Sequence, residues 1–276
     1  KFIRYWFNAD DDDPRHPQFP ELRPQIYNHE AMPYEGCILG YFTVWQGPEN
    51  NVCDSLNIQK RNEVLIGWSK DGFHWNRENK KPFLPVSEDF HAWNAGNVQS
   101  TAGSPLIVGD SLYFYVSGRY NSKPKHDSNF ATGLAMLRRD GFVSMRAGRK
   151  EGYVEIKTKI PANGNYLFVN ADVKGTLAVE VLDDNGQPME GFTKKDCISM
   201  KKSDKTKQMI SWEKHPGVTS LVGKTVRLKF YLNQADIYAF WISAWQTGES
   251  GGYTGGGGPG LSDKGIDTPI DKLKNN

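Results

Sequence analysis

Hydrophobic and polar positions alternate over short stretches of this chain, and helical periodicity is almost absent. Runs rich in β-branched and aromatic residues include CILGYFTVWQG (37–47) and SLYFYVSGR (111–119). Clusters of Gly, Asn, Asp and Pro separate such runs about every ten residues, which is typical of the short strands of a propeller, a barrel or a sandwich. The pattern therefore predicts an all-β protein.

An internal repeat favours the propeller for the first half of the chain. The stretches NEVLIGWSKDGFHW (62–75) and ATGLAMLRRDGFVSM (131–145) each run from a strand into Asp-Gly-Phe. A strand–loop–strand unit of this kind cannot bury both faces of its sheet alone, so repeated copies must stack, as propeller blades do. WSKDGFHW also matches an Asp-box-like turn, in which Asp71 caps the backbone, Gly72 takes a positive φ and Trp75 packs beneath.

The pattern changes at about Glu151. Six or so strands with clean alternation follow, and DDNGQ (183–187) carries the Asn-Gly signal of a hairpin, so this region predicts a β-sandwich of the jelly-roll-like kind. After Trp245 glycine dominates and no apolar pattern repeats, which predicts a flexible tail. The predicted division is propeller blades over 1–146, a sandwich over 147–247 and a glycine-rich tail over 248–276.

Composition narrows the classes of function. The 276 residues suffice for two domains, and a formal charge of +2 without a block of Lys and Arg argues against nucleic acid as a partner. No apolar run approaches the roughly 20 residues of a membrane helix. The three cysteines lack the spacing of a zinc site; one bridge, Cys37 to Cys53, fits across a hairpin, and Cys197 would then be a buried thiol.

Several stretches together resemble one group of bacterial proteins, which itself resembles the five-bladed glycoside hydrolases of the invertase and arabinanase type. The stretches are QIYNHEAMPYEG (25–36), NVCDSLNIQKRNEVLIGWSKDGFHW (51–75), HAWNAGNVQS (91–100), GDSLYFYVSGR (109–119), GLAMLRRDGFVSM (133–145), YLFVNADVKGTLAVEVLD (166–183) and VRLKFYLNQADIYAFWIS (226–243). The resemblance implies the later blades of a five-bladed propeller, followed by a sandwich. The chain begins with Lys1 in a strand-like stretch, so we expect a processed or truncated chain whose first blades lie elsewhere.

The resemblance also implies a catalytic arrangement, because carboxylates from different blades meet in the central cavity of the characterised relatives. Glycoside hydrolysis needs one carboxyl group to protonate the leaving oxygen and a second to attack or to activate water. An aromatic, partly dry pocket raises the pKa of the first. Glu35, beside Tyr34 where a strand begins, is the candidate general acid, with Tyr34 as a substrate contact. Glu30 is a weaker candidate, and a solvated flank is the alternative for both.

The acidic run ADDDDPRHP (9–17) has three interpretations that stay open. It is an exposed loop, a Ca²⁺ site built from the oxygens of Asp10–Asp13, or the source of the third acid of the cavity, for which Asp13 is the candidate. Invertases carry Arg-Asp-Pro in that role, whereas this chain has Asp13-Pro14-Arg15.

The stretch HAWNAGNVQS supplies the candidate sugar contacts. Trp93 offers a flat apolar face to a sugar ring, and amide groups can bind its hydroxyls; loop capping is the alternative. Arg119 would bind the carboxylate or sulfate of an acidic sugar, or form a surface salt bridge. The predicted substrate-binding residues are Tyr34, His91, Trp93, Asn94, Asn97, Gln99 and Arg119.

The leading prediction is a glycoside hydrolase-like protein, secreted, periplasmic or on the cell surface, that cleaves glycosidic bonds by paired-carboxylate chemistry. Glu35 is its general acid and Asp13 the candidate third acid, and the nucleophile or base is expected on a missing N-terminal segment. The predicted protein requires no cofactor, and another chain or segment carries the missing blades. The alternative is a non-catalytic carbohydrate-binding or structural surface protein, which needs an aromatic platform but no paired acid. A glycan phosphorylase is a third alternative, but it requires a cationic phosphate pocket.

Overall fold

The computed structural model describes residues 2–101, 103–120 and 130–270 and confirms the all-β prediction. In the described part of the chain, the only α-helix is α1 (Asn50–Leu56), and η1 (Thr219–Leu221) is a short 3-10 turn. The chain forms two compact units. The first comprises Lys1–Leu106, Tyr113–Met136 and Tyr253–Gly256, and the second comprises Ile107–Leu112, Leu137–Gly252 and Gly257–Asn276.

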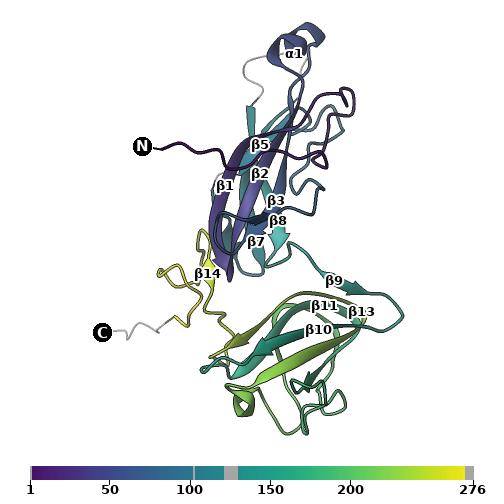
Figure 1. Cartoon of the computed structure of the whole chain (residues 1–276), viewed down its shortest axis with the longest axis vertical. Coiled ribbons are helices and arrows are strands. Elements are labelled where there is room, and N and C mark those ends of the chain that lie inside the picture. Colours follow the sequence, from purple (N-terminus) through teal and green to yellow (C-terminus); the bar gives the residue numbers. More distant parts are fainter. Residues whose placement is uncertain (1, 102, 121–129, 271–276) are drawn as a thin grey trace. The chain divides into compact units, whose positions relative to one another are not determined.

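The first sheet of the first unit is an antiparallel meander. Its strands follow the order β14 (Tyr253–Thr254), β1 (Gln25–Glu35), β2 (Cys37–Gly47), β3 (Arg61–Ser69) and β4 (Trp75–Asn76) (Figure 1). Strand β2 is central and nearly all of its residues are buried, which explains its continuous apolar run. A strand that is buried on both faces does not alternate.

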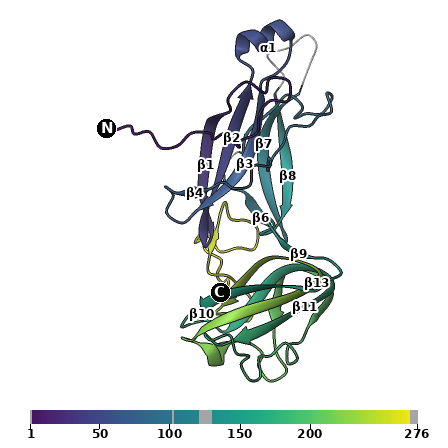
Figure 2. The same cartoon turned by 45° about the vertical axis from the view of Figure 1, so that its right-hand side comes forward.

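A second antiparallel sheet packs on the first (Figure 2). It contains β5 (Asn97–Thr101), β6 (Leu106–Val108), β7 (Ser111–Arg119) and β8 (Phe130–Arg138), with β7 in the centre. The hydroxyl of Thr43 on β2 donates to the carbonyl of Gln99 at 2.5 Å, so the sheets are joined by a hydrogen bond as well as by packing. Two antiparallel sheets stacked in this way are consistent with the predicted partial propeller.

The Asp-box-like turn has the predicted geometry. Asp71 Oδ1 accepts hydrogen bonds from the backbone N–H groups of the two residues after Gly72, at 2.9 and 2.8 Å. Gly72 has a φ of 76°, and the ring of Trp75 packs on Phe42 with the centroids 5.5 Å apart. The motif is therefore a structural turn that fixes where β4 begins.

The second unit is built on one strongly curled sheet, a half-barrel (Figure 2). The order is β10 (Gly152–Lys159), β13 (Thr225–Ser243), β11 (Tyr166–Leu182) and β12 (Met200–Ile210), and β9 (Met145–Ala147) also pairs with β13. The concave side encloses the core, whose buried side chains include Leu167, Val169, Val179, Trp212, Leu228 and Phe230. This all-β unit is consistent with the predicted sandwich class.

The boundaries differ from the predicted ones at 146 and 247. Residues 145–147 already belong to the sheet of the second unit, because Ala147 pairs with Ala235. The described part of the predicted flexible tail is folded: Tyr253 and Thr254 form β14, and Asp267 accepts hydrogen bonds from Arg139 Nη2 and the Ser250 N–H, both at 3.1 Å. Because polar contacts hold this segment, its sequence shows no apolar pattern and resembles that of a linker.

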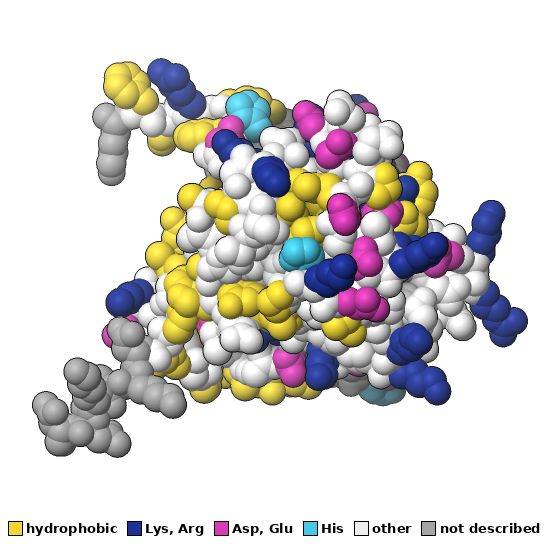
Figure 3. Space-filling view, turned by 90° about the horizontal axis from the view of Figure 1, so that it is seen from below, with side chains coloured by type: hydrophobic (Ala, Val, Ile, Leu, Met, Phe, Trp, Pro, Cys, Tyr) yellow, Lys and Arg dark blue, Asp and Glu magenta, His cyan; other side chains and the backbone are white. Residues whose placement is uncertain are grey.

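The three cysteines are free thiols, so the suggested Cys37–Cys53 bridge is wrong. Cys197 is buried as predicted, and burial raises the pKa of its thiol. Among the described residues, no helix has the length and apolar composition that crossing a bilayer requires. On the face shown in Figure 3, Lys and Arg side chains are interspersed with Asp and Glu side chains.

Candidate functional site

A pocket of about 670 Å³ lies in the first unit, between the N-terminal segment and the segment around β4. We call it the aromatic pocket. It is lined by Trp6, Phe7, Asp10, Asp12, Phe73, Trp75, Asn76, Arg77, Glu78 and Lys80. Its volume falls in the range of small-molecule sites, which combine aromatic walls with a few polar groups.

Two rings stand exposed at this pocket. Trp6 is 48% exposed and Phe73 is 72% exposed. Trp6 Nε1 donates to the Phe73 carbonyl at 3.0 Å, and the ring centroids are 6.3 Å apart. This hydrogen bond fixes the indole against the turn that follows Asp71. The pocket therefore offers flat apolar surfaces that are held in place.

Buried rings lie beside this pocket. The imidazole of His29 stacks on Phe42 with the centroids 4.3 Å apart and meets the edge of Trp75 at 4.6 Å. Burial, and then the positive charge of Arg77, lower the pKa of His29 to about 4. The ring is therefore neutral at pH 7 and serves as a packing group.

An ion-pair network anchors the N-terminal segment to the segment after β4. Asp13, whose side chain has no exposed surface, accepts from Arg77 Nη2 at 2.6 Å and from Lys80 Nζ at 3.3 Å. Lys80 also bonds to Asp10. Partial burial alone would raise the pKa of Asp10, but the hydrogen bond and charge of Lys80 and the charge of Arg77 outweigh it, so the pKa lies below its usual value.

This network argues against the Ca²⁺ hypothesis for Asp10–Asp13. Arg77 and Lys80 neutralise the carboxylates of Asp10 and Asp13, which a calcium ion would have to bind. Within the described ranges, no group of three or more His, Cys, Asp or Glu side chains is placed to hold a metal. Asp13 therefore acts as an internal counterion.

Glu35 and Asp13 lie in different surroundings. Glu35 is the last residue of β1, next to the turn at Gly36, with a φ of 48°, and its backbone pairs with Tyr253 of β14. Burial raises the pKa of the Cys37 thiol, and the negative charge of the nearby Glu35 carboxylate raises it further. Tyr34 is buried on β1. The predicted general acid Glu35 thus lies next to β14 and Cys37, whereas the candidate third acid Asp13 is paired with Arg77 and Lys80.

Glu30 lies on the face of β1 that packs against the second sheet. The hydroxyl of Thr101 on β5 donates to its carboxylate. The pKa of Tyr41, the residue directly opposite on β2, is raised by burial and further by the charge of Glu30. Glu30 is therefore part of the polar contact between the sheets.

Three of the predicted sugar contacts, Asn97, Gln99 and Arg119, lie on the second sheet. Asn97 and Arg119 face each other across β5 and β7, and Gln99 and Arg119 both line a pocket of about 350 Å³. The guanidinium of Arg119 lies over the ring of Phe130, 4.4 Å from its centroid, which is a cation–π contact. Among the residues that the structure describes, Arg119 makes this contact and no ion pair.

Trp93 rests on glycines of two neighbouring strands. A Cβ added to Gly118 on β7 or Gly133 on β8 would lie less than 3.0 Å from the indole. The ring is 39% exposed. In the same loop, His91 is exposed beside Phe90, and Asn94 Nδ2 caps the Pro85 carbonyl at 3.1 Å. Asn94 thus has the capping role that was its alternative interpretation.

The two exposed rings of the aromatic pocket, Trp6 and Phe73, were missed by the sequence analysis. Trp6 was part of a stretch assigned to a strand, and Phe73 was part of a turn assigned a structural role. The two residues are 67 positions apart in the chain and meet through one hydrogen bond. The acidic run at residues 9–17 was the available signal. Its carboxylates can pack on a sheet only when cations neutralise them, which indicates a contact with Lys or Arg elsewhere in the chain.

Comparisons with known proteins leave the function open. No family model and no curated protein matches the chain. The chain is similar to a crystal structure from Parabacteroides distasonis described as a "putative glycoside hydrolase", with 14% identity and a TM-score of 0.26. The match covers 61% of this chain and 53% of that one, so the chain spans about half the length of that structure. At this TM-score the similarity carries no argument about function.

His29 predicts a pH dependence of stability. Its folded pKa of about 4 lies below the usual 6.5, so between these values the unfolded chain takes up a proton that the folded chain does not. Its contribution is intact above pH 6.5 and is lost as the pH falls toward 4. Because the ring is half-buried, we expect about 1 kcal/mol of loss from pH 7 to pH 5. In urea titrations at the two pH values, His29→Leu should lose less stability than the wild type; an equal loss would contradict this account.

The close contact of the Trp93 indole with Gly133 predicts how adding a methyl group at position 133 changes stability. Gly133→Ala places its Cβ against the indole and should destabilise the protein by about 1 to 3 kcal/mol, as overpacking does. The same change in a Trp93→Ala background should cost much less, because the clash is gone. A double-mutant cycle by chemical denaturation measures the difference. If the stability changes of the two substitutions are additive, the Trp93 ring does not lie against Gly133.

Proposed function

We propose that the protein binds carbohydrate in the aromatic pocket. The observation that carries the proposal is the pair of exposed rings, Trp6 and Phe73, held by a hydrogen bond beside charged and amide side chains. Sugar rings present apolar C–H faces that stack on aromatic side chains and hydroxyl groups that both donate and accept hydrogen bonds. Asp12, Asn76 and Glu78 line the same pocket and supply acceptors for those hydroxyls.

The charges of the pocket favour a neutral sugar. Arg77 is largely buried and is paired with Asp13 and Asp10, and Lys80 is paired with the same two residues. These cations already have counterions, so an anionic ligand would gain little from them. The glycan phosphorylase alternative is disfavoured for the same reason, since phosphate needs cations that are not already neutralised.

Glycoside hydrolysis is the second candidate, because two exposed carboxylates, Asp12 and Glu78, line the aromatic pocket. Paired carboxylates on either side of a glycosidic bond are the requirement of this reaction. The assignment of Glu35 as general acid and of Asp13 as third acid stays a prediction. Against it stands the neutralisation of Asp13 by Arg77 and Lys80.

The partner and location remain proposals that rest on the family resemblance. We propose a secreted, periplasmic or cell-surface protein whose further blades come from another chain or segment. Large exposed hydrophobic side chains on β7 and β8, among them Tyr115, Phe130, Leu134 and Met136, support a covering sheet. Exposed apolar patches of this kind commonly mark interaction surfaces.

Loss of ring stacking tests carbohydrate binding. Calorimetric titration with a panel of neutral oligosaccharides should find a ligand, and Trp6→Ala or Phe73→Ala should weaken it by about tenfold, since each removes a stacking surface. Tyr5→Ala is the matched control, because Tyr5 is 77% exposed in the same segment but does not line the pocket. Absence of binding across the panel, or equal loss in Trp6→Ala and Tyr5→Ala, would reject the proposal.

Release of reducing sugar from the same panel separates hydrolysis from binding. If the protein is a hydrolase, Asp12→Asn or Glu78→Gln should lower kcat at least about 100-fold while ligand affinity stays within about twofold. Glu35→Gln tests the earlier candidate in the same assay. A wild-type protein that binds a glycan and releases no product would reject hydrolysis and leave binding intact.

A further inference from the structure

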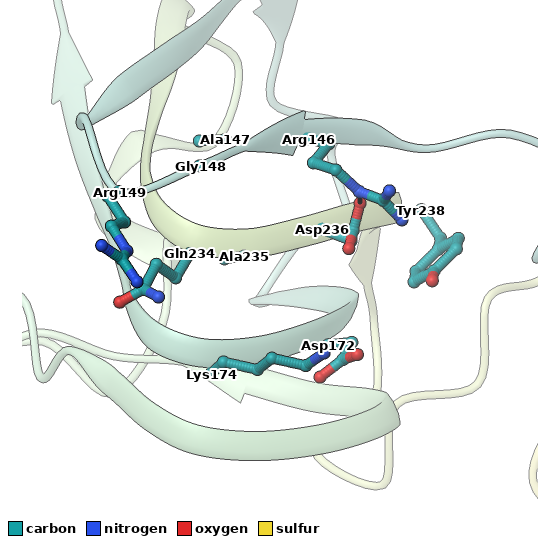
Figure 4. A pocket seen from close by; sticks show the side chains of 10 residues that line it. All are labelled: Arg146, Ala147, Gly148, Arg149, Asp172, Lys174, Gln234, Ala235, Asp236 and Tyr238. Carbon is teal, nitrogen blue, oxygen red and sulfur yellow. Dashed lines mark hydrogen bonds and ion pairs between the residues drawn. The ribbon is translucent and has the colours of Figure 1, made fainter.

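A second pocket lies within the second unit, on the outer face of the curled sheet, and has a volume of about 380 Å³. We call it the outer-face pocket. Figure 4 shows Arg149 and Gln234 at one end and Arg146, Asp236, Tyr238 and Asp172 at the other, with Lys174 reaching along the sheet toward Asp172. None of these residues lines the aromatic pocket.

An irregularity of the sheet forms this pocket. The register of β11 against β13 shifts between Val173 and Thr176, and Gln234 on the opposite strand has a φ of 44°. The Gln234 N–H donates to the Gly148 carbonyl at 2.8 Å, which keeps the loop after β9 close to the sheet. Non-glycine residues in the left-handed region cost free energy and gather at binding sites, and bulges commonly re-aim side chains there.

Three aspartates lie side by side across this face. Asp172 on β11 is directly opposite Asp236 on β13 and Asp204 on β12. Asp236 accepts from Arg146 Nε at 2.7 Å, and Asp204 is paired with Arg138. Within the described ranges the Asp172 side chain has no hydrogen bond or ion pair, although its charge, after that of Asp236, helps to raise the pKa of Arg146. Like charges directly opposite each other are destabilising, so the face retains an acceptor that packing does not explain.

Two exposed cations of this pocket also lack an ion pair. Neither Arg149 nor Lys174 has an ion-pair partner among the residues that the structure describes. The ring of Tyr238 is held by Arg138, whose guanidinium lies 4.9 Å from its centroid. The pocket thus combines a guanidinium beside an amide at one end with a carboxylate and a fixed aromatic ring toward the other.

We propose that the outer-face pocket binds a sugar that carries a carboxylate or sulfate group. The anionic group bonds to the forked guanidinium of Arg149, assisted by Gln234. The hydroxyl groups donate to Asp172, which would repel a simple anion. A neutral sugar would bind Asp172 through its hydroxyl groups but would offer no anionic group to Arg149. An acidic sugar can bind both residues. The choice of a saccharide over another hydroxylated anion rests on the proposed carbohydrate binding.

Titration calorimetry of the full chain tests the proposal with three probes: tetragalacturonate, its fully methyl-esterified form and a chondroitin sulfate tetrasaccharide. We expect one of the two acidic probes to bind and the neutral ester to bind at least about tenfold more weakly. Arg149→Gln should weaken the acidic probe at least about tenfold. The control is Lys159→Gln, which removes an exposed charge from β10 outside the pocket and should leave affinity within about twofold.

Asp172→Asn is the decisive variant. Non-specific attraction of a polyanion would strengthen when this negative charge is removed, whereas replacing the charged hydroxyl acceptor by the weaker amide oxygen of Asn should weaken binding several-fold. Stronger binding by Asp172→Asn, equal effects of Arg149→Gln and Lys159→Gln, or no binding of either acidic probe would overturn the proposal. If Trp6→Ala abolishes binding of the acidic probe and Arg149→Gln does not, the proposal for the outer-face pocket is also overturned. Carbohydrate binding in the aromatic pocket would then still be supported.

Discussion

The ion pair between Asp13 and Arg77 is the contact on which the aromatic pocket depends. It joins the N-terminal segment to the residue that follows β4, with the Asp13 side chain fully buried and the N–O distance at 2.6 Å. Burying two charges is costly, and removing one partner of such a pair leaves the other uncompensated, which costs about 3 to 5 kcal/mol. The segment that carries Trp6 is therefore anchored across the sheet and cannot move away without exposing or stranding Arg77.

This anchoring explains how an acidic run serves a protein with a nearly balanced charge. Four adjacent aspartates repel one another in a free loop, but here Arg77 and Lys80 bind two of them. Arg77 also lies over the ring of Phe42, 4.7 Å from its centroid, so the same cation joins the acidic segment to the aromatic packing below. Charge and apolar burial thus act together in placing the exposed rings.

The sequence predicted what short-range physics determines. Alternation identifies most strands, and the Asp-box-like turn is correct in detail because Ser69, Asp71 and Gly72 form it within a few residues. The aromatic pocket depends on Trp6 meeting Phe73 and on Asp13 meeting Arg77, and no local pattern encodes these long-range contacts. The glycine-rich segment was misjudged for the same reason, since Asp267 and its partner Arg139 lie 128 positions apart.

The candidate sites differ in how far the protein satisfies its own charges. In the aromatic pocket Arg77 and Lys80 have carboxylate partners, so a ligand gains mainly from covering exposed rings. On the second unit, neither the Arg149 guanidinium nor the Asp172 carboxylate forms an ion pair in the described part of the chain. A ligand therefore gains by supplying an anionic group and hydroxyl donors together. Exposed aromatic surface favours ligands with apolar faces, whereas uncompensated charge selects ligands by ionic group. The first site should consequently tolerate changes in salt concentration, while binding at the second should weaken as ionic strength rises, because charged contacts at an open surface are screened.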